Sequence, residues 1–197
     1  MKKFLLLLSL VLIVIGCSNN KKQAIDPEYE ELAKNDNINN LGIWKIGDYV
    51  DEFGEKMGIK YIYASAQGYF SNSATTNSPL DITITVSPYS VDLKLYEYSG
   101  NHPVKGEGYM NFSIKDSKGL VHYIETYNDE NGNNTVKDLN YKSDSIMRDV
   151  LRKGGEIKFY GVADRYGSKS EYTFTLNNAD FLEKALNQIG QTLEREE

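Results

Sequence analysis

The chain has 197 residues, of which 40% are hydrophobic, 12% aromatic and 25% charged, and its formal net charge is −6. This composition is typical of a globular protein and excludes an intrinsically disordered chain or, beyond the N-terminus, a membrane-embedded one. The acidic balance and the lack of a basic stripe disfavour nucleic-acid binding, because a negative surface repels phosphate backbones. A single cysteine, Cys17, excludes an intramolecular disulfide and a cysteine cluster for metal binding.

The N-terminus has the parts of an export signal. Positive charge at Met1-Lys2-Lys3 precedes an apolar run, Phe4–Ile15, which is followed by Gly16-Cys17. As a helix, that run covers about 18 Å, well short of a hydrocarbon core of about 30 Å. We therefore predict that residues 1–16 are a signal peptide cleaved between Gly16 and Cys17.

The segment Val14-Ile15-Gly16-Cys17 resembles the lipobox of bacterial lipoproteins. The resemblance implies acylation of the Cys17 sulfur, and two or three acyl chains (palmitate among them) anchor a protein stably to a membrane. Ser18 stands where an aspartate would resemble an inner-membrane retention signal, so the outer membrane of the cell envelope is favoured if the source is Gram-negative. The alternative is an ordinary secretory signal with an incidental cysteine.

Residues 17–40 are predicted to be a flexible tether, because they are polar, rich in asparagine and poor in apolar residues. A short helix from Asp26 to about Lys34 is an alternative within the tether, since Asp26-Pro27 suits a helix start. Residues 41–197 are predicted to form a single β-rich globular domain.

Alternation of apolar and polar residues predicts most of the strands. The clearest case is the run from Leu80 to Val86, in which every second residue is aliphatic. The same period is present around 91–95, 110–114, 157–159 and 172–176, and Ile62, Ala64, Ala66 and Phe70 mark one face of another strand. Trp44, beside the first predicted strand, is interpreted as a core anchor.

Turn residues and helical periodicity complete the predicted fold. Asn131-Gly132 favours a hairpin between strands near 119–127 and 135–141. Two segments instead have apolar residues at helical spacing: one after Ser143 that ends at Gly154, and one after Asn178 whose apolar face is Phe181, Leu182, Ala185, Leu186 and Ile189. We predict a mainly β fold, an antiparallel β-sandwich of about eight strands with one inserted short helix and a C-terminal amphipathic helix.

No catalytic, cofactor-binding or metal-binding residues are assigned from the sequence. His102 lies in a predicted turn and His122 in a predicted strand, and neither has a carboxylate partner that the sequence can identify. The acids Asp51, Glu52 and Glu55 cluster in a predicted loop, where solvated charge is the simpler interpretation than a glycosidase pair.

The fifteen tyrosines offer the main candidate for a binding surface. Tyr61, Tyr63 and Tyr69 alternate with apolar residues and are therefore predicted to lie together on the outer face of one strand. Exposed tyrosines give contact area at low entropic cost and can stack on sugar rings. The alternative interpretation is that tyrosine simply suits half-buried strand faces.

The layout from Trp44 to Leu186 is similar to that of small lipoproteins associated with type VI secretion: an early tryptophan, many strands, a short helix, two strands and a Phe-Leu-x-x-Ala-Leu helix. That family usually carries cysteines that this chain lacks, and the resemblance implies an accessory role at the cell envelope. We therefore expect a non-catalytic, lipid-anchored envelope protein that binds protein or glycan or assists assembly of an envelope complex. An envelope hydrolase acting on glycan or peptidoglycan is the alternative.

Overall fold

The computed structural model of the protein describes residues 40–87, 90–100, 102–104, 108–129, 132–135, 142–165 and 167–190. The predicted signal peptide, Cys17 and its cleavage site, nearly all of the tether and its alternative helix lie outside the described residues. So do residues 136–141 of one predicted strand.

The described chain is mainly β-strand, and every strand pair is antiparallel. The strands are β1 (Lys45–Val50), β2 (Lys56–Ser71), β3 (Ser78–Val86), β4 (Val91–Tyr96), β5 (His102–Pro103), β6 (Gly108–Lys115), β7 (Val121–Asn128), β8 (Asn133–Thr135), β9 (Ile157–Arg165) and β10 (Ser168–Leu176). Three helices accompany them: α2 (Glu97–Gly100), α3 (Lys142–Lys153) and α4 (Leu182–Gln188). The predicted mainly β, antiparallel fold with an inserted and a C-terminal helix is confirmed.

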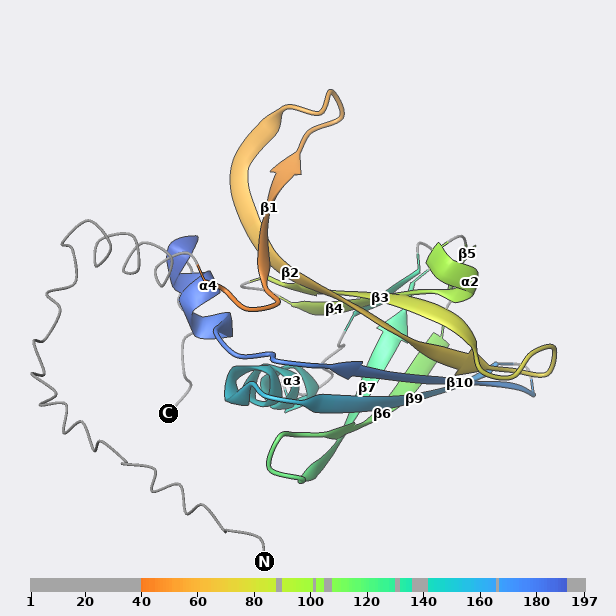
Figure 1. The fold of residues 1–197 in the computed structure, drawn as a ribbon. Helices are drawn as coiled ribbons and strands as arrows, with labels where there is room; N and C mark the ends of the chain where they lie inside the picture. The colour runs from red at the N-terminus through yellow and green to blue at the C-terminus, as the bar shows by residue number, and fades with distance from the viewer. Residues whose placement is uncertain are drawn as a thin grey trace, which may run out of the picture. The chain divides into compact units, whose positions relative to one another are not determined.

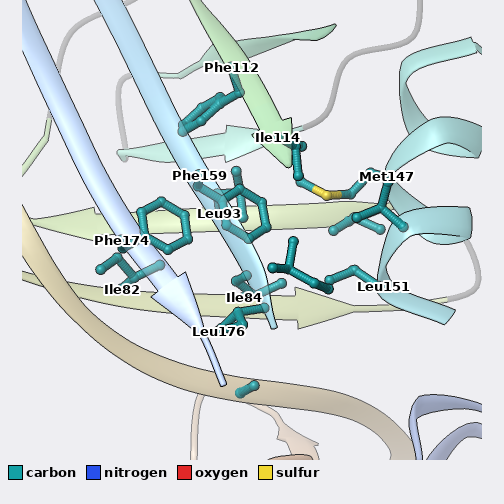
Figure 2. Close-up of a cluster of buried hydrophobic side chains, with 14 of the residues drawn as sticks. Ile82, Ile84, Leu93, Phe112, Ile114, Met147, Leu151, Phe159, Phe174 and Leu176 are labelled. Atoms are coloured by element: carbon teal, nitrogen blue, oxygen red, sulfur yellow. The ribbon is translucent and has the colours of Figure 1, made fainter. Parts of the chain in front are cut away.

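All of the strands belong to one sheet that curls back on itself. The sheet runs in the order β1-β2-β10-β9-β6-β7-β8-β4-β3, and β3 pairs again with β2. Strands β3 and β4 therefore face β6, β9 and β10 across a shared interior, as Figure 2 shows for their side chains. The two packed faces of the predicted sandwich are thus parts of a single curled sheet.

The interior is filled by the apolar residues that the period-2 pattern selects. Every second residue of β3 and β4 is buried, including Ile82, Ile84 and Leu93. On the facing strands the rings of Phe159 and Phe174 stack with centroids 4.4 Å apart. Figure 2 shows these rings between the two layers.

Helix α3 closes one end of this interior. Met147 and Leu151 point from α3 toward the buried ends of the strands (Figure 2), and both are fully buried together with Val150. Gly154 ends the helix with a φ of +64°, a conformation that suits glycine. The predicted helix and its stop residue are confirmed.

The C-terminal helix is shorter than predicted. Leu182, Ala185 and Leu186 are buried as expected, but the helix starts at Leu182 and not soon after Asn178. Phe181 precedes it with a φ of +73° and is about half exposed, so its assignment to the buried face was wrong. The left-handed turn at Phe181 directs its ring away from the core.

Trp44 links the start of β1 to the C-terminal segment. Its ring is buried, and Nε1 donates a hydrogen bond of 3.2 Å to the carbonyl oxygen of Ala179. Lys184 of α4 also donates to the carbonyl oxygen of Asn40, at 2.9 Å. The interpretation of Trp44 as a core anchor is confirmed.

Candidate functional site

The structure separates the three predicted surface tyrosines into two places. Tyr61, Tyr63 and Tyr69 all lie on the outer face of β2, because they alternate with buried residues such as Ile62 and Phe70. Six residues separate Tyr63 from Tyr69, however, which corresponds to roughly 20 Å along a strand. The three side chains therefore do not form one continuous stripe.

Tyr61 and Tyr63 belong to an aromatic cluster with Tyr49 of β1. The ring centroids of Tyr49 and Tyr61 are 4.8 Å apart, and those of Tyr61 and Tyr63 are 5.8 Å apart. Lys45 Nζ lies 6.0 Å from the centre of the Tyr63 ring, within reach of a cation–π interaction. Burial in this cluster raises the pKa of the Tyr49 hydroxyl, and the negative charge of Asp92 adds to the effect. We call Tyr49, Tyr61 and Tyr63 the tyrosine cluster.

The cluster sits at the base of a projecting hairpin. Strand β1 and the first part of β2 extend away from the other strands, as the orange segment of Figure 1 shows. From residue 52 to residue 60 every side chain is exposed, so no described part of the chain covers either face of the hairpin there. We call residues 49–60 the hairpin arm.

Besides Tyr49 of the tyrosine cluster, four apolar side chains are exposed on the hairpin arm. Phe53 at the tip is 82% exposed, and three further residues are more than half exposed: Val50, Met57 and Ile59. Isolated exposed apolar residues are common on protein surfaces, but four within ten residues of one projecting element indicate an interaction site. Met57 and Ile59 alternate with Lys56, Gly58 and Lys60 like the rest of β2, so their exposure cannot be predicted from the pattern of this strand alone.

The arm is nevertheless well ordered by its own polar contacts. The carboxylate of Asp51 accepts hydrogen bonds from the backbone N–H groups of Phe53, at 2.9 Å, and Glu55, at 2.8 Å, which fixes the turn. Asp48 accepts from both Lys56 and Lys60 at 2.6 Å, across the two strands. These lysines lower the pKa of Asp48, so the pair of contacts persists at neutral pH. The apolar tip is therefore held in a defined shape while it is exposed.

The three acids considered as a glycosidase pair, Asp51, Glu52 and Glu55, lie at the tip of the arm and not in a cleft. Asp51 is engaged with the turn backbone, and Glu52 and Glu55 are exposed. Their contribution is negative charge around the apolar side chains. The interpretation of these acids as solvated charge is consistent with this placement.

His122 has a carboxylate partner that the sequence could not identify. Its Nε2 donates to Asp116 Oδ2 at 3.0 Å, and Lys153 of α3 reaches the same oxygen at 3.1 Å. The other oxygen of Asp116 accepts from the backbone N–H groups of Lys118, at 3.0 Å, and Leu120, at 2.9 Å. The hydrogen bond from His122 is the largest of the effects that hold the pKa of Asp116 well below its usual range. With both oxygens engaged, this buried carboxylate fastens the β6–β7 turn to α3.

Within the described ranges, no three His, Cys, Asp or Glu side chains gather in a way that could hold a metal ion. The side chain of His102 lies outside what the structure describes. In the same part of the chain, the helices are all too short or too polar to cross a membrane.

Comparison of the chain with protein-family models, with curated proteins and with solved structures finds no match.

Proposed function

We propose that this protein is a non-catalytic, lipid-anchored component of the cell envelope that binds a partner protein through its hairpin arm. The observation that carries the proposal is the set of exposed apolar side chains on an ordered, projecting hairpin. Burial of such side chains at an interface is the main source of binding energy between proteins, and aromatic residues such as Phe53 dominate it.

The charges of the arm indicate the chemistry of the partner. Asp51, Glu52 and Glu55 surround the tip, while Lys56 and Lys60 are paired with Asp48. This acidic rim repels anionic lipid headgroups, so insertion of the tip into a membrane is disfavoured. A protein surface with an apolar pocket and a basic rim would complement the arm.

The anchor in the proposal is supported by the lipobox-like residues Ile15-Gly16-Cys17, and the outer membrane is the favoured location in a Gram-negative cell. The non-catalytic role is supported by the engagement of Asp116 and His122 in a structural contact. If the purified protein released soluble fragments from labelled peptidoglycan, the hydrolase alternative would replace the binding role.

Metabolic labelling with radioactive palmitate tests the anchor. We expect incorporation into the wild-type chain and none into the Cys17→Ala variant. Equal labelling of the two chains would contradict lipidation at Cys17.

Photocrosslinking in cells tests the arm. A photoreactive phenylalanine analogue at position 53 should give a discrete adduct with another protein, identified by mass spectrometry. The same analogue at Leu120 is the matched control, because Leu120 is also an exposed apolar residue, 57% accessible, in the β6–β7 turn. The adduct at position 53 should disappear when Met57 and Ile59 are replaced by serine. Adducts with lipid alone, or equal adducts from both positions, would overturn the proposal.

A further inference from the structure

Three exposed tyrosines from distant parts of the sequence lie in one line across the sheet. Tyr123 of β7 is directly opposite Ser113 of β6, and Ser113 is opposite Tyr160 of β9. Tyr160 is opposite Thr173 of β10, which is opposite Tyr69 of β2. The exposed fractions of the tyrosines are 74%, 40% and 60% for Tyr123, Tyr160 and Tyr69. We call these three residues the tyrosine row.

The line crosses five neighbouring strands in the order β7, β6, β9, β10 and β2, and a tyrosine lies on every second one of them. Neighbouring strands are about 4.8 Å apart, so successive rings of the row originate about 9.6 Å from each other along the sheet. The intervening residues, Ser113 and Thr173, are small and polar. They leave room beside each ring for a ligand to contact it.

The row is supported from behind by the core. Phe159 is the inward-facing neighbour of Tyr160, and Phe112 and Phe174 are the inward-facing neighbours of the intervening Ser113 and Thr173. All three rings are buried, and Phe174 pairs with both of the others. Five hydrogen-bonded strands hold the positions of the tyrosines before any ligand arrives. Such preorganisation reduces the entropy that binding would otherwise cost.

Carboxylates, ammonium groups and uncharged hydrogen-bonding side chains flank the row. On one side of the row, two residues away from it on each strand, a parallel line crosses the same five strands. In sheet order from β2 it consists of Ser71, Glu171, Val162, Asn111 and Glu125, and all but Val162 have hydrogen-bonding side chains. On the other side lie Lys115 and Lys158, which are opposite each other. Tyr160 and Lys169 both hydrogen-bond to Glu171 and lower the pKa of its carboxyl group.

These flanking charges indicate an uncharged ligand. Three carboxylates, Glu125, Glu156 and Glu171, are matched by three ammonium groups, Lys115, Lys158 and Lys169. Lys158 is paired with Glu156 and Lys169 with Glu171, so the flanks favour neither a polyanion nor a polycation. They do supply donors and acceptors for hydroxyl and amide groups. Aromatic rings in turn pack against the C–H faces of sugar rings.

We propose that the tyrosine row is a binding site for an extended, uncharged saccharide chain. An extended β-linked glycan presents the same ring face at every second unit, and a periodic ligand of this kind matches rings repeated on every second strand. A protein partner would have no reason to share this period. The site is separate from the hairpin arm and does not depend on the function proposed for it.

Calorimetric titration of the full-length protein in detergent tests the site, with two uncharged hexamers, cellohexaose and hexa-N-acetylchitohexaose, as probes. At least one hexamer should bind, and the corresponding disaccharide should bind roughly tenfold more weakly, because it can cover only one ring of a row about 19 Å long. Tyr160→Ala should weaken hexamer binding roughly tenfold, whereas Tyr160→Phe, which keeps the ring, should bind within a few-fold of wild type.

Tyr109→Ala is the matched control. Tyr109 is also an exposed tyrosine on the outer face, on β6, but lies four residues from Ser113 and packs against Tyr127. This variant should keep wild-type affinity. The proposal is overturned if neither hexamer binds, if the disaccharide binds as tightly as the hexamer, or if Tyr109→Ala and Tyr160→Ala lose affinity equally. It is also overturned if Tyr160→Ala leaves saccharide binding intact but abolishes the protein adduct formed at position 53, since the row would then belong to the protein interface.

Discussion

The ring of Tyr61 lies over the backbone of Gly47, its direct partner on the neighbouring strand. A Cβ atom added at residue 47 would be 2.4 Å from Cζ of Tyr61, far closer than two carbon atoms can approach. The absence of a side chain at Gly47 therefore lets the ring occupy this position between Tyr49 and Tyr63. Aromatic cover of a strand glycine also keeps water from its backbone.

This relationship predicts that the effect of Gly47→Ala depends on Tyr61. In the wild-type background the added methyl should force the ring aside and lower the free energy of unfolding by about 1–3 kcal/mol. In a Tyr61→Ala background the same change should be neutral or stabilising, because alanine restricts the unfolded chain more than glycine does. Denaturant unfolding of the four chains forms the double-mutant cycle. Equal effects in both backgrounds would contradict the steric role of the ring.

Helix α4 is expected to stabilise the core through Leu186. Because this side chain is fully buried, Leu186→Ala should lower the free energy of unfolding by about 2–5 kcal/mol. Phe181→Ala is the matched control and should cost less than about 1 kcal/mol, since its ring is half exposed outside the buried face. A Leu186 variant that kept the wild-type denaturation midpoint would show that α4 does not cover the core.

The hydrogen bond of Trp44 is expected to couple the stability of the two ends of the described domain. Trp44→Phe keeps most of the buried ring but removes the donor to the Ala179 carbonyl. A buried acceptor left without a partner costs about 1–3 kcal/mol. Hydrogen exchange should also speed up at the backbone amides of α4 more than at those of β6. Uniform acceleration across the domain would mean that the bond has only a global effect.

Acid should weaken the domain partly through Asp116. Because hydrogen bonds from His122 and Lys153 lower its pKa in the folded state, the folded protein binds fewer protons than the unfolded chain, in which an aspartate titrates at about pH 3.9. The stabilisation is therefore fully present above that pH and is lost as the pH falls toward the folded pKa. Asp116→Asn, which can still accept from the turn backbone, should be less stable than wild type at pH 7. The two stabilities should converge as the pH is lowered below about 4. Parallel stability curves from pH 7 to pH 2 would contradict this role.

Local patterns were sufficient to predict most of the secondary structure. The alternation in β3 is visible in the sequence because one face of the strand is buried, and a period of two follows directly from strand geometry. Helix α3 was equally clear from its apolar spacing and from Gly154. Phe181 was misassigned because a single residue with positive φ interrupts the helical period, and nothing in its side chain signals that conformation.

The candidate sites depend on strand pairing, which single-strand patterns do not contain. Tyr69 was identified as an outward-facing residue, but its neighbours in the row, Tyr160 and Tyr123, are 91 and 54 residues away in the chain. Which residues become neighbours is set by the register of five strands. The exposed arm was missed for a related reason: its β1 and β2 segments pair with each other beyond the point where other strands cover them.

The length of β2 gives the protein a fixed spacing between two surfaces. This one strand of 16 residues carries Ile59 of the hairpin arm and Tyr69 of the tyrosine row. Ten residues separate them, a contour of roughly 33 Å in a strand. A protein held at the arm and a saccharide held at the row would thus be kept at a set separation, and each would raise the local concentration of the other. Insertion of one residue between Tyr63 and Tyr69 would turn the outward side chains of one half inward. The length and the parity of β2 would therefore both determine how the two proposed binding sites are placed relative to each other.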